Sequence, residues 1–117
     1  MAVEACSIRF YETAKGKRPF QEYLLSLADR NAIDRINARL ARIRLGNFGD
    51  VKLLGGGLGE IRIDYGPGYR VYFTRTGNYV VLLLCAGEKA TQPKDIRRAR
   101  EFLADYERRQ DASKRII

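Results

Sequence analysis

Residues 60–86 read EIRIDYGPGYRVYFTRTGNYVVLLLCA, and the prediction of the fold class rests mainly on this stretch. It contains three segments rich in β-branched and aromatic residues, at positions 60–65, 69–75 and 79–86. The short turn sequences GPG and TGN separate them. This spacing predicts three antiparallel strands joined by tight turns.

The segments on either side of this meander predict one more strand and three helices. Residues 5–11 alternate weakly and predict a first strand. Asp29 is a suitable N-cap and Gly46 a suitable stop for the middle helix. Residues 46–59 contain six glycines and predict a loop or a weak edge strand. Apolar residues recur at helical spacing in three segments, at 19–27, 30–45 and 93–109.

The order of these elements predicts the fold class. A strand, two helices, three strands and a last helix are typical of a small α+β domain. We expect the first strand to join the meander in one sheet, with the helices on one face of that sheet. A length of 117 residues suits one domain. We expect this domain to span residues 1–109, followed by a flexible tail at 110–117.

The charge of the chain favours an anionic partner. There are 22 Lys and Arg against 14 Asp and Glu, which gives a net charge of +8. RNA, DNA, an acidic protein segment or a membrane surface would suit this charge, and so would an ordinary basic surface without such a partner. The sequence has no export signal and no apolar run long enough to span a bilayer, so we expect a cytoplasmic protein with no membrane partner.

The rare residue types limit the chemistry. The sequence has no histidine, which is the commonest general base and metal ligand. Its two cysteines, Cys6 and Cys85, cannot build a zinc site by themselves and are expected to be reduced thiols. We therefore expect no metal and no cofactor, and a reaction would have to use Arg, Lys, Tyr or carboxylates.

The first hairpin of the meander separates apolar from charged side chains. If GPG is a three-residue turn, Asp64 faces Arg70, Arg62 faces Tyr72 and Glu60 faces Thr74. Because side chains alternate between the faces of a sheet, one face carries a core set and the other a charged set. The core set is Ile61, Ile63, Tyr65, Tyr69, Val71 and Phe73. The charged set is Glu60, Arg62, Asp64, Arg70, Tyr72 and Thr74.

The charged set has two interpretations. Arg62 and Arg70 beside Tyr72, with Lys89 after the last strand and Lys52 before the hairpin, would suit a phosphodiester with a stackable base. Alternatively, these residues form the solvated face of an antiparallel sheet, with an ordinary cross-strand ion pair between Asp64 and Arg70.

Three stretches of the chain resemble a known family. They are RINARLARIRLGNFGDVK (35–52), GEIRIDYGPGYRVYF (59–73) and LLLCAGEKATQPKDIRRA (82–99). They strongly resemble the HigB-like addiction module killer toxins of the RelE/ParE superfamily, and the resemblance covers roughly residues 8–106. It implies a RelE-like fold and the toxin of a bacterial type II toxin-antitoxin system. Such a toxin is an mRNA interferase that cuts mRNA on the ribosome, and a small helix-turn-helix antitoxin (HigA-like) neutralises it.

The resemblance also implies roles for single residues. Arg70, in the motif GYR, corresponds to the family's arginine that contacts the scissile phosphate. Arg62 corresponds to a basic residue of the preceding strand, and Lys89 to an Arg or Lys after the last strand. Better-studied RelE toxins carry a Tyr or His near the start of the final helix, where this sequence has Gln92 and Asp95.

We therefore expect a metal-independent endoribonuclease in which the ribose 2′-hydroxyl attacks the adjacent phosphorus. Arg70, Arg62 and Lys89 would stabilise the added negative charge. Glu60 is the fourth expected catalytic residue, as a base or as an orienting group. Asp64 and Lys89 are alternative bases. The residues expected to bind RNA are Lys52, Tyr72, Gln92, Lys94 and Arg97.

Two rival functions stay open at this point. ParE-like members of the superfamily inhibit DNA gyrase and cleave nothing, and a non-catalytic RNA-binding regulatory domain would carry a similar surface. Two helix faces would either dock on ribosomal RNA or be ordinary solvated faces. They consist of Arg35, Arg39 and Arg42, and of Lys94, Arg97, Arg98 and Arg100.

Overall fold

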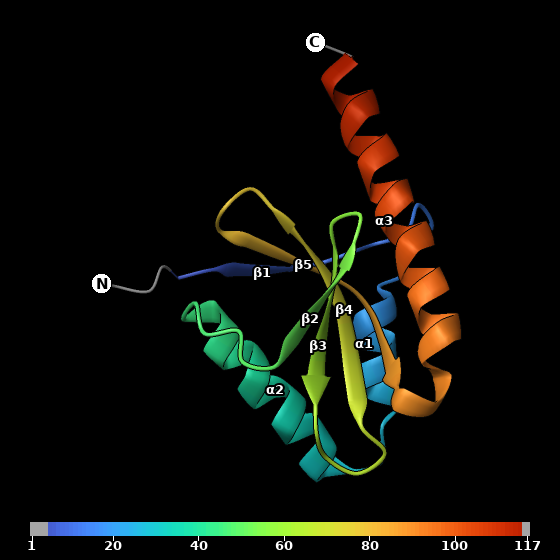
Figure 1. The fold of residues 1–117 in the computed structure, drawn as a ribbon. Helices are drawn as coiled ribbons and strands as arrows, with labels where there is room; N and C mark the ends of the chain where they lie inside the picture. Colours follow the sequence, from blue (N-terminus) through green and yellow to red (C-terminus); the bar gives the residue numbers. More distant parts are fainter. Residues whose placement is uncertain (1–4, 116–117) are drawn as a thin grey trace.

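The computed structural model describes residues 5–115 and has an α+β fold (Figure 1). Within these residues there are three α-helices and one mixed five-stranded sheet. A short 3-10 turn (η1) leads into the last helix. The elements in chain order are β1 (Ser7–Phe10), α1 (Pro19–Ser26), α2 (Arg30–Arg44), β2 (Val51–Gly55), β3 (Leu58–Ile63), β4 (Tyr69–Thr76), β5 (Val80–Glu88), η1 (Lys89–Thr91) and α3 (Gln92–Arg115).

The sheet has the strand order β1-β5-β4-β3-β2. Strand β1 is parallel to β5, and all other neighbouring strands are antiparallel. The predicted meander and its union with the first strand are confirmed. The glycine-rich segment supplies a fifth strand, β2, which forms a hairpin with β3 at the edge of the sheet. Gly55, Gly56 and Gly57 form the turn of this hairpin, and all three have a positive φ, which glycine adopts without steric strain.

The predicted register of the β3–β4 hairpin is wrong. Arg62 lies opposite Arg70, and Glu60 lies opposite Tyr72. Each pairing is two residues away from the prediction, because the connection is longer than the three residues of GPG. Tyr65 leaves the strand, and its hydroxyl donates a hydrogen bond to Asp29 at 3.0 Å. Because the shift is even, every side chain of the two strands keeps its predicted face.

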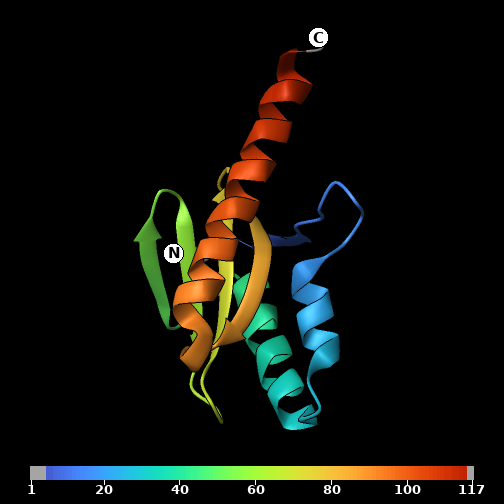
Figure 2. The same ribbon diagram turned by 90° about the vertical axis from the view of Figure 1, so that its right-hand side faces the viewer.

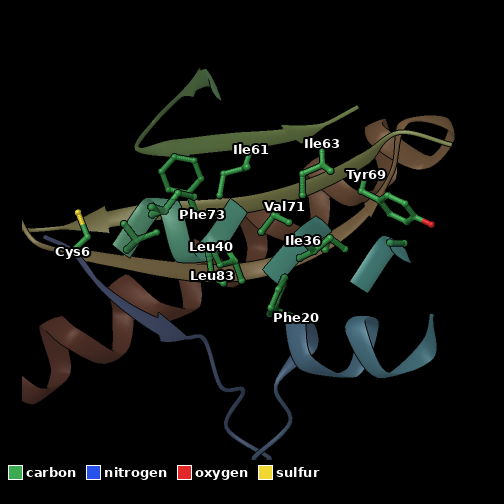
Figure 3. Close-up of a cluster of buried hydrophobic side chains, with 14 residues drawn as sticks. Cys6, Phe20, Ile36, Leu40, Ile61, Ile63, Tyr69, Val71, Phe73 and Leu83 are labelled. Carbon is green, nitrogen blue, oxygen red and sulfur yellow. The ribbon is translucent and has the colours of Figure 1, made fainter. Parts of the chain in front are cut away.

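The first face of the sheet packs against α1 and α2 (Figure 3). The predicted core set lies here: Ile61, Ile63, Tyr69, Val71 and Phe73 are buried, and Tyr65 packs against them half-buried. The side chain of Asp29 caps α2 by accepting from the backbone N–H groups of Asn31 and Ala32, as predicted. Gly46, just after α2, has a φ of 88°.

The other face is covered by α3, so the expectation of helices on one face only is wrong (Figure 2). Ala99 and Leu103 of α3 pack in a second buried cluster with side chains of the sheet. The physical reason lies in β5: an unbroken apolar run is typical of a strand buried on both faces. The sheet members of this cluster include Leu58, Tyr72, Leu82, Leu84 and Cys85.

Helix α3 is longer than predicted. It continues past the expected end at 109 to Arg115, so the described part of the expected tail is helical. Figures 1 and 2 show its C-terminal part projecting beyond the sheet. The tail sequence contains no Pro or Gly to stop the helix. Residues 116–117 of the predicted tail lie outside the described residues. No helix within residues 5–115 is long and apolar enough to cross a membrane.

Candidate phosphate-binding site

Arg62 and Arg70 are cross-strand neighbours, and both side chains lie on the face of the sheet that α3 covers in part. Side chains opposite each other on adjacent antiparallel strands point to the same face, so the register brings two guanidinium groups together. The Arg62 side chain is 33% exposed and that of Arg70 12% exposed. Both therefore lie at the border between the second hydrophobic cluster and solvent.

Glu60 is the buried anion of this cluster. Its carboxylate accepts a hydrogen bond from Arg62 Nε at 3.0 Å and one from Gln92 Nε2 at 2.6 Å. Arg70 Nε lies 4.0 Å from the same carboxylate. The Glu60 side chain is fully buried, so its oxygens are not accessible to a ribose hydroxyl. The predicted role as a general base is incompatible with this burial, whereas the orienting role fits the geometry.

Gly68 brings Arg70 close to Lys89. A Cβ atom at Gly68 would lie 3.7 Å from Arg70 Nη1 and 3.4 Å from Lys89 Cβ, so both side chains flank the same backbone. The backbone N–H of Lys89 donates to the carbonyl of Gly68 at 2.7 Å, which fixes the β3–β4 turn against η1. Arg70 Nη1 also donates to the carbonyl of Tyr69 at 3.2 Å. Lys89 is exposed and adds a third cation at this end of the sheet.

The predicted stacking role of Tyr72 is incompatible with the structure. The side chain is fully buried under α3, and its hydroxyl has no hydrogen-bond partner among the described residues. Burial, and next the neighbouring Glu60 carboxylate, raise the pKa of this phenol. Tyr72 is therefore a neutral core residue next to Glu60. An RNA base could stack on its ring only if α3 moved away.

Lys52 lies beside the same row of residues. It is opposite Glu60 in the β2–β3 register, so its side chain shares the face of Arg62 and Arg70, and it is exposed. Two other predicted RNA contacts, Lys94 and Arg97, are exposed on the first turns of α3. Gln92 is bound to Glu60, so its side-chain amide has a structural partner.

The two other carboxylates considered at sequence level lie in different environments. Asp95 is 3% exposed, accepts a hydrogen bond from the Thr91 hydroxyl and lies 3.8 Å from Arg98. It packs directly on Gly87, where any Cβ atom would collide with its carboxylate. Asp64 is exposed in the β3–β4 turn, and Arg70 approaches Glu60 rather than Asp64. The predicted Asp64–Arg70 ion pair is therefore wrong.

Two arginines that the sequence assigned to possible RNA-docking faces have structural roles. Arg39 donates to the carbonyls of Arg62, Phe48 and Asp50, and burial, followed by the neighbouring Arg42, lowers its pKa. These bonds tie α2 to the hairpin that carries Arg62.

Arg100 donates to the carbonyls of Leu54 and Gly55, at 2.9 and 3.2 Å, and ties α3 to β2. Backbone carbonyl acceptors have no sequence signature, so no pattern could have identified either role. On the same two helix faces, Arg35 lies over the Tyr65 ring at 4.6 Å and Arg98 over the Phe102 ring at 5.5 Å.

The cluster has the charge and the donor groups that suit a phosphate group. Arg62, Arg70 and Lys89 provide three positive charges, and one buried carboxylate offsets only part of them. Guanidinium groups held in this way present paired N–H donors that match phosphate oxygens. Contacts with Glu60 and the Tyr69 carbonyl orient the Arg62 and Arg70 side chains, and such preorganisation reduces the entropy cost of binding.

Comparison with known proteins gives one relative. No protein-family model matches the chain. An uncharacterized protein of Haemophilus influenzae (strain Rd) is 47% identical over 81 residues, which cover 69% of this chain and 82% of the relative. The chain belongs to the same family as this protein. Since the relative is described only as uncharacterized, membership assigns no activity, and a function must be argued from the site.

Proposed function

We propose that this protein is the toxin of a type II toxin-antitoxin system and acts as a metal-independent mRNA endoribonuclease. The observation that carries the proposal is the Arg62–Arg70 pair, oriented by the buried Glu60 and flanked by Lys89. The order of strand, two helices, antiparallel strands and helix agrees with the RelE-like fold that the sequence resemblance implies. The resemblance to HigB-like toxins supports the choice of mRNA among phosphodiester substrates.

The proposed reaction is a transesterification. The ribose 2′-oxygen bonds to phosphorus and the bond from phosphorus to the 5′-oxygen breaks, which leaves a cyclic phosphate and a 5′-hydroxyl. Arg70 and Arg62 neutralise the charge that develops on the non-bridging oxygens. Lys89 is a second clamp and donates a proton to the leaving 5′-oxygen.

The proton of the 2′-hydroxyl needs an acceptor outside the buried carboxylates. Glu60 and Asp95 are both covered. The exposed Asp64 of the β3–β4 turn, water or a group of the ribosome would therefore accept this proton. A ribosomal acceptor agrees with ribosome-dependent cleavage. The proposed partners are mRNA on the ribosome in the cytoplasm and a helix-turn-helix antitoxin that neutralises the toxin.

Arg70→Ala tests the proposal. Loss of one preorganised donor is expected to reduce the rate of mRNA cleavage by about 10² to 10³. The measurement is the cleavage rate of mRNA on programmed ribosomes in the presence of a chelator for free transition metals, with 5′-end mapping of the products. Arg30→Ala is the matched control, because Arg30 is exposed at the start of α2. Equal rates for a folded Arg70→Ala variant and the wild type would refute the site.

A second function is favoured by one observation. The burial of Glu60 and Tyr72 makes the predicted carboxylate base and the predicted stacking ring inaccessible. A non-catalytic RNA-binding regulatory domain would need only the cations. It predicts RNA binding that depends on Arg70, with intact transcripts after induced expression. DNA damage with intact transcripts would instead support the gyrase-inhibiting class.

A further inference from the structure

Strand β2 forms an open edge of the sheet. It is the last strand in the order, and Figure 2 shows it at the outer side of the sheet. The Arg62 N–H donates to the Asp50 carbonyl, which identifies one hydrogen-bonded pair of the β2–β3 ladder. Hydrogen-bonded pairs alternate along an antiparallel ladder, so Val51 and Leu53 direct their backbone N–H and C=O groups away from β3. This edge can therefore accept another strand.

An apolar groove lies beside this edge, on the face of the sheet that packs against α2. It encloses about 500 Å³ and is lined by Phe48, Val51, Leu53, Gly59, Phe73 and Arg75 among others. A Cβ atom at Gly59 would lie 2.5 Å from the Phe73 ring, so the absence of a side chain there lets the ring form the floor. Leu53 is 79% exposed. An exposed leucine above an apolar groove marks a surface suited to a partner.

Cations lie near this strand on both faces of the sheet. Lys52 points to the opposite face of the sheet and is exposed. Arg75 lies over the Phe48 ring at 5.0 Å and adds a positive charge at the groove. Asp50, the acidic residue just before β2, has Arg39 as a neighbouring charge. A second copy of this chain is a poor occupant, because each copy carries a net charge of +8 and would bring its own Lys52 to the interface.

We propose that β2 binds an extended protein segment in which apolar and acidic residues alternate. Such a segment would pair with the open edge as a further strand. Because strand side chains alternate, its apolar residues would enter the groove beside Leu53, and its acidic residues would lie beside Lys52. The proposal does not depend on RNA cleavage, and the binding experiment below gives the same result whether or not the arginine cluster is a nuclease.

The test uses the full chain and a short, end-capped, fluorescent peptide in which valine and glutamate alternate. Two reference peptides carry lysine in place of glutamate, or N-methyl groups on alternate residues to block strand pairing. We expect the glutamate peptide to bind best. We also expect it to protect the amides of Val51 and Leu53 from hydrogen exchange, because both face the open edge.

Variants distinguish binding at β2 from non-specific attraction between the basic protein and the acidic peptide. Leu53→Asp should weaken binding of the glutamate peptide at least about tenfold. The change removes an apolar contact and adds a negative charge that repels the glutamates of the peptide. Leu25→Asp is the control: Leu25 is 86% exposed on α1. Lys52→Glu should reverse the preference toward the lysine peptide.

Three results would overturn the proposal. The first is equal binding of the glutamate peptide to Leu53→Asp and to Leu25→Asp. The second is equal binding of the N-methylated peptide and its parent. The third is a dimer of the free protein in sedimentation experiments with protection of the β2 amides, which would assign this edge to a second copy.

Discussion

Glu60 is a fully buried carboxylate with two arginines and an amide around it. Removing one partner of a buried charge pair costs more than the pair itself contributes, because the remaining charges keep their desolvation penalty. The groups that lose their anion here are Arg62, Arg70 and Gln92. At the residue scale, this carboxylate stabilises the fold and holds the proposed site.

We expect Glu60→Ala to lower the free energy of unfolding by about 3 kcal/mol. Glu60→Gln should cost less, since it retains the volume and can still accept a hydrogen bond from Gln92. Urea denaturation measures both. Glu22→Ala, at an exposed position of α1, is the control. If Glu60→Ala and Glu22→Ala had the same free energy of unfolding, the contacts of Glu60 with the two arginines and Gln92 would not stabilise the fold.

At the scale of elements, a second polar contact anchors the middle of α3 to Tyr11, the residue that follows β1. The Tyr11 hydroxyl donates to Asp105 at 2.5 Å, and Arg109 forms an ion pair with the same carboxylate at 2.8 Å. Burial and the nearby Asp105 raise the pKa of Tyr11 to about 12. The Tyr11 hydrogen bond is in turn the main reason why the pKa of Asp105 lies below its usual range.

We expect Tyr11→Phe to lower the free energy of unfolding by about 1.5–3 kcal/mol at pH 7, the range for a hydrogen bond to a charged group. Asp105 has a lowered pKa in the folded state, so its contribution is full above its unfolded pKa of about 4 and is lost as the pH falls through the folded value. The difference between the variant and the wild type should therefore shrink below pH 4.

Urea denaturation at pH 7 and pH 3 measures this effect. The control is Tyr79→Phe, because Tyr79 is 51% exposed. A constant difference between Tyr11→Phe and the wild type across this pH range would show that lost packing, and not the bond to Asp105, causes the effect.

At the scale of the whole molecule, the net charge of +8 acts at long range, whereas the proposed site uses only a few of the cations. Single-stranded nucleic acid binding weakens with salt, with a slope of about −0.7 in log K against log salt for each neutralised phosphate. Arg62 and Arg70 belong to one cluster, so their contributions to the salt dependence of RNA binding are best measured by replacing both.

We expect the double variant Arg62→Ala, Arg70→Ala to reduce the magnitude of this slope by about 1.4 if each arginine neutralises one phosphate. Anisotropy of an uncleavable 2′-O-methyl oligonucleotide at several KCl concentrations measures the slope. Arg30→Ala should leave it nearly unchanged. If the double variant and Arg30→Ala reduced the magnitude of the slope equally, the basic surface would bind RNA without a defined site.

Much of the fold follows from short-range patterns. Alternation in the first hairpin separates Ile61, Ile63 and Val71 from Glu60 and Arg70, and this separation is confirmed because the register error was even. The register itself depends on Tyr65, which leaves the strand for Asp29, far away in the sequence. Local patterns contain no information about such a partner.

Local sequence patterns were sufficient for the order of the three helices and of β1, β3, β4 and β5. They were also sufficient for the two faces of the meander, the cap at Asp29 and the excess of positive charge. Each of these depends on neighbouring residues or on composition. The pairing of Arg62 with Arg70, and the burial of Glu60 and Tyr72 under α3, became visible only in the folded chain. The physical reason is that register and burial arise from contacts between distant residues, such as Gln92 with Glu60. The three candidate cations could be named from the sequence, whereas the carboxylate that orients two of them required the packed helix.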